Sequence, residues 1–381
     1  MLLYVHIPFC VAKCRYCAFA SEAITVDALD AWERAFAAEA AHYDEVLERP
    51  VVQTVYLGGG TPSLLPAPSF ERLVETLARH FTIPADVEFT IEANPDCVAD
   101  AQLPRVWRNL GANRVSLGAQ SFCDAELSLL GRPHSAARTL TAVTLLRAAG
   151  FANLSLDLIW GLPGQDFASW MDTLAAAVAL GPEHLSMYGL TLEPGAPLAK
   201  DVERGASALP DEEEAARMYL DGGEFLESRG FAHYEISNFA RESFAARHNQ
   251  GYWEGGDYLG LGPSAVSTVA GRRWKNPSSV ARYAAHAGAR AWGRDAESLT
   301  DAVLGRERLM LALRIASGMD LGLYRRVMGR DAWDAHAPFV RTLREKGLAD
   351  VTQKRLMLTR QGMLISNGII GRLVFEERQV R

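Results

Sequence analysis

The chain has 381 residues, with 39 Lys and Arg against 46 Asp and Glu, and a formal net charge of -7. This acidic balance, without a long Lys/Arg cluster, argues against nucleic acid as the main partner. Five cysteines without a paired framework argue against a secreted disulfide scaffold, and no apolar stretch reaches the roughly 18 residues that a membrane-spanning helix needs. Without a signal-peptide pattern either, the sequence predicts a cytoplasmic globular protein with no transmembrane segment, and leaves peripheral membrane contact open.

Short apolar strand-like runs alternate with helical patterns over the first 230 residues. The expected strand and helix pairs are 2–7 and 27–46, 54–57 and 69–81, 87–92 and 101–109, 114–117 and 136–149, 154–159 and 167–180, and 184–192 and 211–228. Six such units imply parallel strands under covering helices, closed or partly closed as a barrel. Functional loops are then expected at the carboxyl ends of the strands. We assign this α/β domain to residues 1–240.

The rest of the chain predicts a connecting segment and a smaller domain. The connecting segment, 241–300, contains Tyr258-Leu-Gly-Leu-Gly262, which we interpret as a glycine-rich loop close to a bulky ligand. The C-terminal domain, 301–381, is expected to be mainly helical and winged-helix-like. Its expected helices are 302–315, 321–327, 335–346 and 360–370, with short strands at 347–351 and 355–359. No helix there is strongly basic, and a winged helix need not bind DNA.

Three cysteines crowd one short loop near the start of the chain. Cys10, Cys14 and Cys17 follow a C-x3-C-x2-C spacing, whereas the other two cysteines are isolated. Thiolates bind iron–sulfur clusters and zinc alike, but a structural zinc site is closed by four ligands, whereas three leave one metal position open. Zinc would need a fourth ligand such as His6, whose strand is expected to point it away from the loop. Three ordinary thiols are the remaining alternative.

Polar and glycine residues recur at the ends of successive expected strands. A Gly-Gly-Gly-Thr-Pro turn at 58–62 follows the second strand, Glu92 ends the third, Gln120 ends the fourth, and Asp157 lies in the fifth. Glycines let a ligand approach the backbone closely, although such a turn could equally be a tight connection. Each polar residue alone could be a satisfied core group or a helix cap. Together they predict a polar pocket above the cysteine loop.

The cysteine spacing and the glycine turn resemble the radical S-adenosylmethionine (SAM) superfamily, whose members hold a 4Fe-4S cluster on a partial β/α barrel. The resemblance implies that Cys10, Cys14 and Cys17 ligate such a cluster. It also implies that SAM chelates the open iron, and that an electron donor reduces the cluster to cleave SAM. The fold class expected from it is a partial (β/α)6 radical SAM barrel with the smaller C-terminal domain.

A closer resemblance is to oxygen-independent coproporphyrinogen III oxidase and its relatives. It rests on Tyr4-Val-His-Ile-Pro-Phe-Cys10, Ile91-Glu92, Gln120-Ser-Phe, Leu130-Gly-Arg132 and Asp157-Leu-Ile-Trp-Gly-Leu-Pro163. The residues that this resemblance implies for SAM contact are Tyr4, Gly59, Gly60, Thr61, Glu92, Gln120, Arg132 and Asp157. It also implies that Tyr16 packs between the cluster ligands.

Two departures separate the chain from the decarboxylating oxidase itself. Phe19 stands where that enzyme has an additional cysteine, and the first strand begins at Leu2 without a longer extension before it. In addition, the segment His248-Asn-Gln-Gly-Tyr252-Trp253 matches the H-N-x-x-Y-W heme-binding motif of the heme chaperone (HemW) branch. A His imidazole is a normal axial heme ligand, and aromatic rings can cover a porphyrin face. Without this match, such a His would be interpreted as a packed surface residue.

The resemblance therefore implies a heme chaperone that binds heme, a 4Fe-4S cluster and SAM. Its expected partners are heme-accepting proteins, respiratory ones among them, and an electron donor for the cluster. We expect no coproporphyrinogen III dehydrogenase activity. The alternatives are oxidative decarboxylation of coproporphyrinogen III, and a radical reaction on another substrate.

Overall fold

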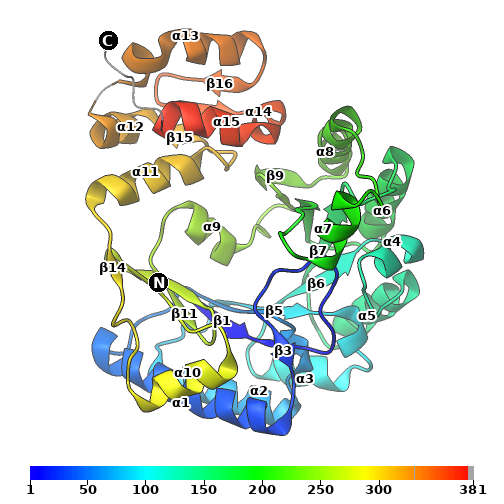
Figure 1. Cartoon of the computed structure of the whole chain (residues 1–381), viewed down its shortest axis with the longest axis vertical. Coiled ribbons are helices and arrows are strands. Elements are labelled where there is room, and N and C mark those ends of the chain that lie inside the picture. The colour runs from blue at the N-terminus through cyan, green and yellow to red at the C-terminus, as the bar shows by residue number, and fades with distance from the viewer. Residues whose placement is uncertain (330, 376–381) are drawn as a thin grey trace.

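The computed structural model of the protein describes residues 1–329 and 331–375, and centres on a twelve-stranded sheet (Figure 1). The strand order is β14-β13-β12-β11-β1-β4-β5-β6-β7-β8-β10-β9. Six neighbouring strands pair in parallel: β1 (Leu2–Ile7), β4 (Thr54–Gly59), β5 (Glu88–Ala93), β6 (Arg114–Gln120), β7 (Asn153–Trp160) and β8 (His184–Gly189). These are the six predicted strands, so the predicted partial barrel is confirmed.

The helices that connect these strands also follow the predicted order. They are α1 (Val26–Leu47), α2 (Ala67–His80), α3 (Gln102–Asn109), α5 (Ala136–Ala148), α6 (Phe167–Ala179) and α8 (Glu212–Ser228). Local capping fixes several starts, because the side chains of Thr25, Ser135, Asp166 and Asp211 accept hydrogen bonds from backbone amides of the first turn. Three glutamates follow Asp211 in the first turn of α8, where they complement the helix dipole.

The two faces of the barrel strands differ in chemistry. On β1, Leu3, Val5 and Ile7 are fully buried in the apolar core, whereas Tyr4 and His6 line an interior cavity. The other strands repeat this period of two, and their interior side chains include Tyr56, Glu92, Arg114, Ser116, Asp157, Ser186 and Tyr188. Closed β/α barrels usually fill this space with branched apolar side chains. The polar interior here encloses a cavity instead of a second core.

Further strands extend the sheet on both sides. On one side, β9 (Ala232–Glu235) and β10 (Asn238–Ala240) add to β8 in antiparallel fashion. On the other, β11 (Tyr258–Leu261) pairs in parallel with β1 and is followed by β12 (Val266–Val269), β13 (Arg272–Lys275) and β14 (Glu297–Ser298).

The interpretation of 258–262 as a glycine-rich loop was wrong, because most of it is strand β11. Its glycines serve close packing between strands. A Cβ at Gly260 would lie 2.4 Å from the carbonyl oxygen of Val266, and one at Gly262 would lie 2.4 Å from that of His6. Gly262 also has φ +96°, which favours glycine. These glycines therefore let β11 and its turn approach their neighbours.

The C-terminal part is helical with a small antiparallel sheet. Its elements are α11 (Asp301–Ala312), β15 (Met319–Asp320), α12 (Leu321–Met328), α13 (Ala332–Glu345), β16 (Ala349–Val351), β17 (Arg355–Leu358), α14 (Arg360–Leu364) and α15 (Ser366–Ile370), with sheet order β15-β17-β16. This agrees with the predicted helical, winged-helix-like fold (Figure 1). Residues 376–381 of the predicted domain lie outside the described residues, and the division at 240 and 300 stays a prediction.

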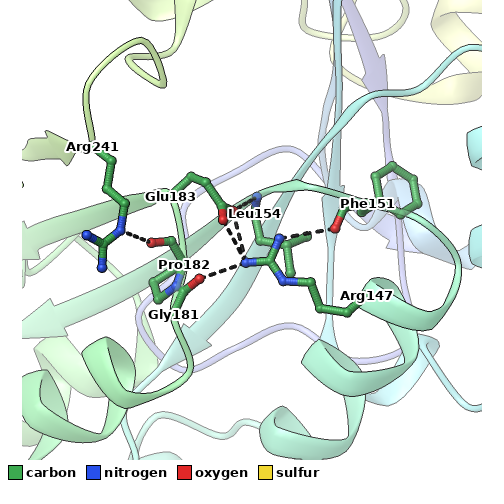
Figure 2. Close-up of polar contacts among 7 residues, drawn as sticks. All are labelled: Arg147, Phe151, Leu154, Gly181, Pro182, Glu183 and Arg241. Carbon is green, nitrogen blue, oxygen red and sulfur yellow. Dashed lines mark hydrogen bonds and ion pairs between the residues drawn. The ribbon is translucent and has the colours of Figure 1, made fainter.

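An arginine–glutamate pair fastens the amino-terminal ends of β7 and β8 (Figure 2). Arg147 Nη2, at the end of α5, lies 3.0 Å from both carboxylate oxygens of Glu183. Glu183 also accepts the backbone amide of Leu154 at 2.9 Å, and Arg147 donates to the carbonyls of Phe151 and Gly181. The pair therefore satisfies backbone groups at the amino-terminal end of these two strands. Among the described residues, no helix is long and apolar enough to cross a bilayer.

Candidate functional site

The cysteine loop lies between two short strands at the carboxyl end of β1. Cys10 ends β2 (Phe9–Cys10), and Cys14 and Cys17 precede β3 (Glu22–Ala23). All three thiols are free and half-buried, and burial raises the pKa of Cys17. Cys10 Sγ lies 3.4 Å from the Thr61 hydroxyl, and Arg132 donates to Cys14 Sγ at 3.4 Å. The candidate ligands are therefore three thiols on one loop beside the Arg132 cation. This arrangement suits a cluster held by thiolates.

In the described part of the chain, no three His, Cys, Asp or Glu side chains converge closely enough to hold a metal ion. The cysteine sulfurs thus share one loop without forming a closed ligand set. His6 was expected to point away from this loop, but its Nε2 lies 2.9 Å from the Ala20 carbonyl, just beyond the third cysteine. Its Nδ1 pairs with the Tyr4 hydroxyl at 3.0 Å. Both ring nitrogens are occupied, so His6 organises the loop and has no free nitrogen for zinc.

The glycine turn packs against Glu92. The Glu92 carboxylate accepts hydrogen bonds from the Tyr56 hydroxyl at 2.8 Å and the Gly59 amide at 3.1 Å. Burial raises the pKa of Glu92 to about 7, although these two donors favour the ionised form. Gly59 has φ +110°, and a Cβ at Gly60 would lie 2.6 Å from the carbonyl oxygen of Phe9. Only glycine fits here, because the turn presses against the strand that leads into the cysteine loop.

Arg132 and Gln120 lie beside the cysteine loop. Besides Cys14, Arg132 donates to the Gly118 carbonyl at 3.1 Å. Burial opposes its charge, but the interactions with Tyr16 and Cys14 outweigh this effect and raise the pKa of Arg132. Gln120 has φ +65° where the pairing register of β6 shifts. A Cβ at Gly118 would lie 2.8 Å from the Gln120 amide nitrogen and 3.3 Å from Arg132 Nη2. The backbone of β6 thus leaves room for both side chains.

Asp157 lies deeper in the barrel, among serines of three strands. It accepts hydrogen bonds from Ser116 at 2.9 Å, Ser186 at 2.7 Å and Ser155 at 3.3 Å. Burial raises its pKa, while the hydroxyl donors oppose the shift. The carboxylates of Asp157 and Glu92, both predicted to contact SAM, therefore already have hydrogen-bond partners within the protein.

Helix α9 (Arg247–Trp253) carries the predicted heme motif. It closes the amino-terminal end of the barrel, opposite the cysteine loop. It contacts β4 and α11, and lies between the sheet and the C-terminal domain (Figure 1). His248 is buried, with only 3% of the residue exposed. Its Nδ1 pairs with the Thr54 hydroxyl at 2.7 Å. Its Nε2 is buried without a hydrogen-bond partner among the described residues.

Aromatic rings surround this imidazole. Tyr56 stacks on His248 with ring centroids 4.9 Å apart, and Tyr252 packs edge-on at 4.9 Å. Burial, and to a lesser degree the charge of Arg114, lowers the pKa of His248 to about 3. The ring is therefore neutral at physiological pH and retains a nitrogen lone pair. Trp253 lies on the same helix but outside the set of described residues that line the cavity.

A cavity of about 720 Å³ connects the two regions inside the barrel. At one end it is bounded by Ala18, Phe19 and Ala20, which follow the cysteines, and at the other by His248 and Tyr252. This volume falls within the range of about 300 to 1,000 Å³ that is typical of ligand sites. The structure thus links the cysteine loop and the heme motif through one interior space, although they lie some 230 positions apart in the sequence.

Several residues of this cavity were missed from the sequence. They include Arg114, Ser116, His184, Ser186 and Tyr188, together with Thr54 and Glu88 behind His248. The available signal was strict alternation: polar residues occupy every second position of strands whose other positions are apolar. In a parallel barrel whose outer face is covered by helices, that pattern indicates a hydrated or ligand-filled interior.

Comparisons with known proteins agree with this geometry. The radical SAM superfamily matches residues 4–177, and the HemN C-terminal domain matches residues 299–365. The chain is 36% identical to heme chaperone HemW of Mycobacterium tuberculosis (strain H37Rv), over 98% of this chain and 94% of that protein. It is 32% identical to heme chaperone HemW of Bacillus subtilis, over 98% and 99% respectively. Its fold matches coproporphyrinogen III oxidase HemN from Escherichia coli with a TM-score of 0.83 and 24% identity, over 98% and 90% of the two chains.

The partial barrel, with its three-cysteine loop at the carboxyl end of β1, defines a protein of the radical SAM superfamily. Within that superfamily, the chain belongs to the family of the heme chaperone HemW proteins.

Proposed function

We propose that this protein is a heme chaperone, which binds heme in the barrel cavity and passes it to acceptor proteins. The observation that carries the proposal is the buried, neutral imidazole of His248, whose Nε2 has no partner among the described residues and which lines a cavity of about 720 Å³. A neutral imidazole with a free lone pair is an axial ligand for heme iron. The hydrogen bond between Nδ1 and Thr54 would hold the ring in the ligating tautomer.

The surrounding aromatics support a flat ligand. Tyr56 and Tyr252 contact the imidazole, and Phe19, which is largely exposed, lies on the cavity rim near the cysteine loop. Because Nε2 is shielded from solvent, heme binding would require neighbouring side chains to move aside. Controlled access of this kind suits a carrier, which must both hold and release its cargo. Trp253 would stabilise α9 rather than touch heme.

We further propose that Cys10, Cys14 and Cys17 hold a 4Fe-4S cluster and that SAM binds beside it. When bound, this pair would supply one-electron chemistry at the mouth of the cavity. The SAM contacts would come from Tyr4, Gly59, Gly60, Thr61, Glu92, Gln120, Arg132 and Asp157. Tyr16 would pack beside the cysteine loop. Arg132, next to Cys14, would offset the negative charge of thiolate ligands. A reductase or small electron carrier would be the donor, and the proposed compartment is the cytoplasm.

The test is heme titration of anaerobically reconstituted protein, followed by absorption spectroscopy. His248→Ala should weaken heme binding and change the axial-ligand spectrum while the cluster stays intact. Gln250→Ala, a change at a variable position of the same motif on α9 and outside the cavity lining, is the matched control and should keep the spectrum. Loaded protein should then transfer heme to an apo-acceptor, for which a respiratory cytochrome is the first choice. The proposal fails if His248→Ala leaves the heme affinity and spectrum unchanged, or if the protein converts coproporphyrinogen III with stoichiometric SAM cleavage.

A further inference from the structure

Arg114, the first residue of β6, is a buried cation that forms no ion pair with another described residue. It is 2% exposed and lines the cavity. Its Nε has no hydrogen-bond partner, and across residues 1–329 and 331–375 its side chain forms no hydrogen bond or ion pair. A guanidinium removed from bulk water is costly unless an anion compensates its charge. Among the described residues, no anion pairs with Arg114 to offset this cost.

Two carboxylates that interact with Arg114 already accept hydrogen bonds from other groups. Glu92 and Asp157 interact electrostatically with Arg114, but neither forms an ion pair with it. Glu92 accepts hydrogen bonds from Tyr56 and Gly59, and Asp157 accepts them from three serines. Burial also favours their neutral forms, because it raises both pKa values. They are thus weak partners for a guanidinium.

The permanent charges that line the cavity are positive. Among the described residues that form it, Arg114 and Lys275 carry permanent positive charges, and none is an aspartate or glutamate. This holds although the whole chain has a formal net charge of -7. Lys275 is exposed, whereas Arg114 lies inside with His248. Both side chains line the same cavity, and the charge of Arg114 adds to the larger effect of burial in lowering the pKa of His248.

We propose that Arg114 binds a propionate carboxylate of the heme held in this cavity, and this inference rests on the proposed heme-binding function. Arginine suits the task, because its planar fork can pair with both oxygens of a carboxylate. Arg114 and His248 would then fix the ligand at two points, one at a propionate and one at the iron. The methionyl carboxylate of SAM carries the same chemistry, so the experiment must separate the two sources.

The experiment compares heme with iron protoporphyrin IX dimethyl ester, whose propionates carry no charge. Wild-type protein should bind heme about ten- to a hundredfold more tightly than the ester, the range expected for a charge-assisted hydrogen bond. Arg114→Gln should remove most of that preference, and Arg114→Lys should retain part of it. Lys275→Gln, which removes the exposed cation of the same cavity, should retain most of it. A merely structural role would weaken both ligands equally.

The wild-type comparison of heme and ester needs no variant, so it stands even if Arg114→Gln folds poorly. Equal affinity of the wild-type protein for heme and ester would overturn the inference while leaving the heme chaperone proposal in place. No binding of either porphyrin would instead overturn the proposed function. SAM is titrated separately into cluster-loaded protein, and its affinity should be the same in Arg114→Gln. A loss of SAM affinity with heme preference intact would assign Arg114 to SAM and overturn the inference.

Discussion

Glu88 holds His248 in place, although the two residues are 160 positions apart in the sequence. One carboxylate oxygen of Glu88 accepts the backbone amide of His248 at 2.9 Å, and the other accepts that of Arg247 at 2.9 Å. These amides begin α9, where backbone donors have no partner inside the helix and favour a negative charge. A strand of the barrel thus fixes the start of the helix that carries the proposed heme ligand.

Glu88→Ala should leave both amides without this acceptor and destabilise the protein by about 1 to 3 kcal/mol. Heme affinity should also fall, because His248 loses its fixed position. Urea unfolding and heme titration measure the two effects. Glu71→Ala, at an exposed position on α2, is the control and should change neither. Unchanged heme affinity in a destabilised Glu88→Ala protein would mean that α9 keeps its position without this cap.

Cys14→Ala should abolish the iron–sulfur cluster, because three thiolates are the smallest set that holds it with one iron open. Iron and sulfide analysis and the EPR spectrum of the reduced protein measure the cluster. Cys123→Ala is the matched control, since this thiol is also half-buried but lies outside the loop. A cluster that survives in Cys14→Ala, or one that is lost in Cys123→Ala, would contradict the assignment.

Glu92→Ala should weaken SAM binding, because it removes the side chain that fixes both Tyr56 and the Gly59 turn. With the cluster intact, addition of SAM should then change its EPR spectrum only at higher SAM concentration than in the wild type. Glu92→Gln, which keeps the size and one acceptor oxygen, should have a smaller effect. Normal SAM affinity in a Glu92→Ala, Asp157→Ala double variant would rule out this pocket.

Glu39 on α1 predicts a pH-dependent stability. It accepts hydrogen bonds from Tyr283, Asn276 and the amide of Gly262, and burial raises its pKa from 4.5 to about 7. Because this pKa is raised, the folded state binds the proton more tightly than the unfolded state does. The resulting stabilisation of the folded state is fully present below about pH 4.5. It is lost as the pH rises through about 7.

Glu39→Gln should therefore gain stability relative to wild type as the pH rises from about 5 to 8, by up to about 3 kcal/mol. Chemical unfolding at several pH values measures the difference. Asp30→Asn, an exposed change on the same helix, should follow the wild-type pH dependence. A stability difference between Glu39→Gln and wild type that stays constant with pH would show that Glu39 keeps its charge in the folded protein.

Much of the fold could be predicted from the sequence, because its signals are local. Apolar runs and helical periodicity located the six strands of the barrel and their helices, and the side chains of Thr25 and Asp211 cap helices within three residues of themselves. The cysteine triplet is local in the same sense, since all three thiols share one loop. Glycine was ambiguous: it marked a tight turn at Gly59 but close strand packing at Gly260.

The interior of the site was decided only by tertiary structure. Nothing near His248 in the sequence indicates that Thr54 and Glu88 hold it, or that its Nε2 is buried without a partner in the described part of the chain. Likewise, only the closed barrel buries Arg114, and among the described residues no carboxylate forms an ion pair with it. Local patterns depend on residues a few positions apart, whereas burial and pairing depend on which distant strands the fold brings together. The sequence by itself therefore determined the scaffold and the cysteine loop, and the closure of the barrel determined the cavity.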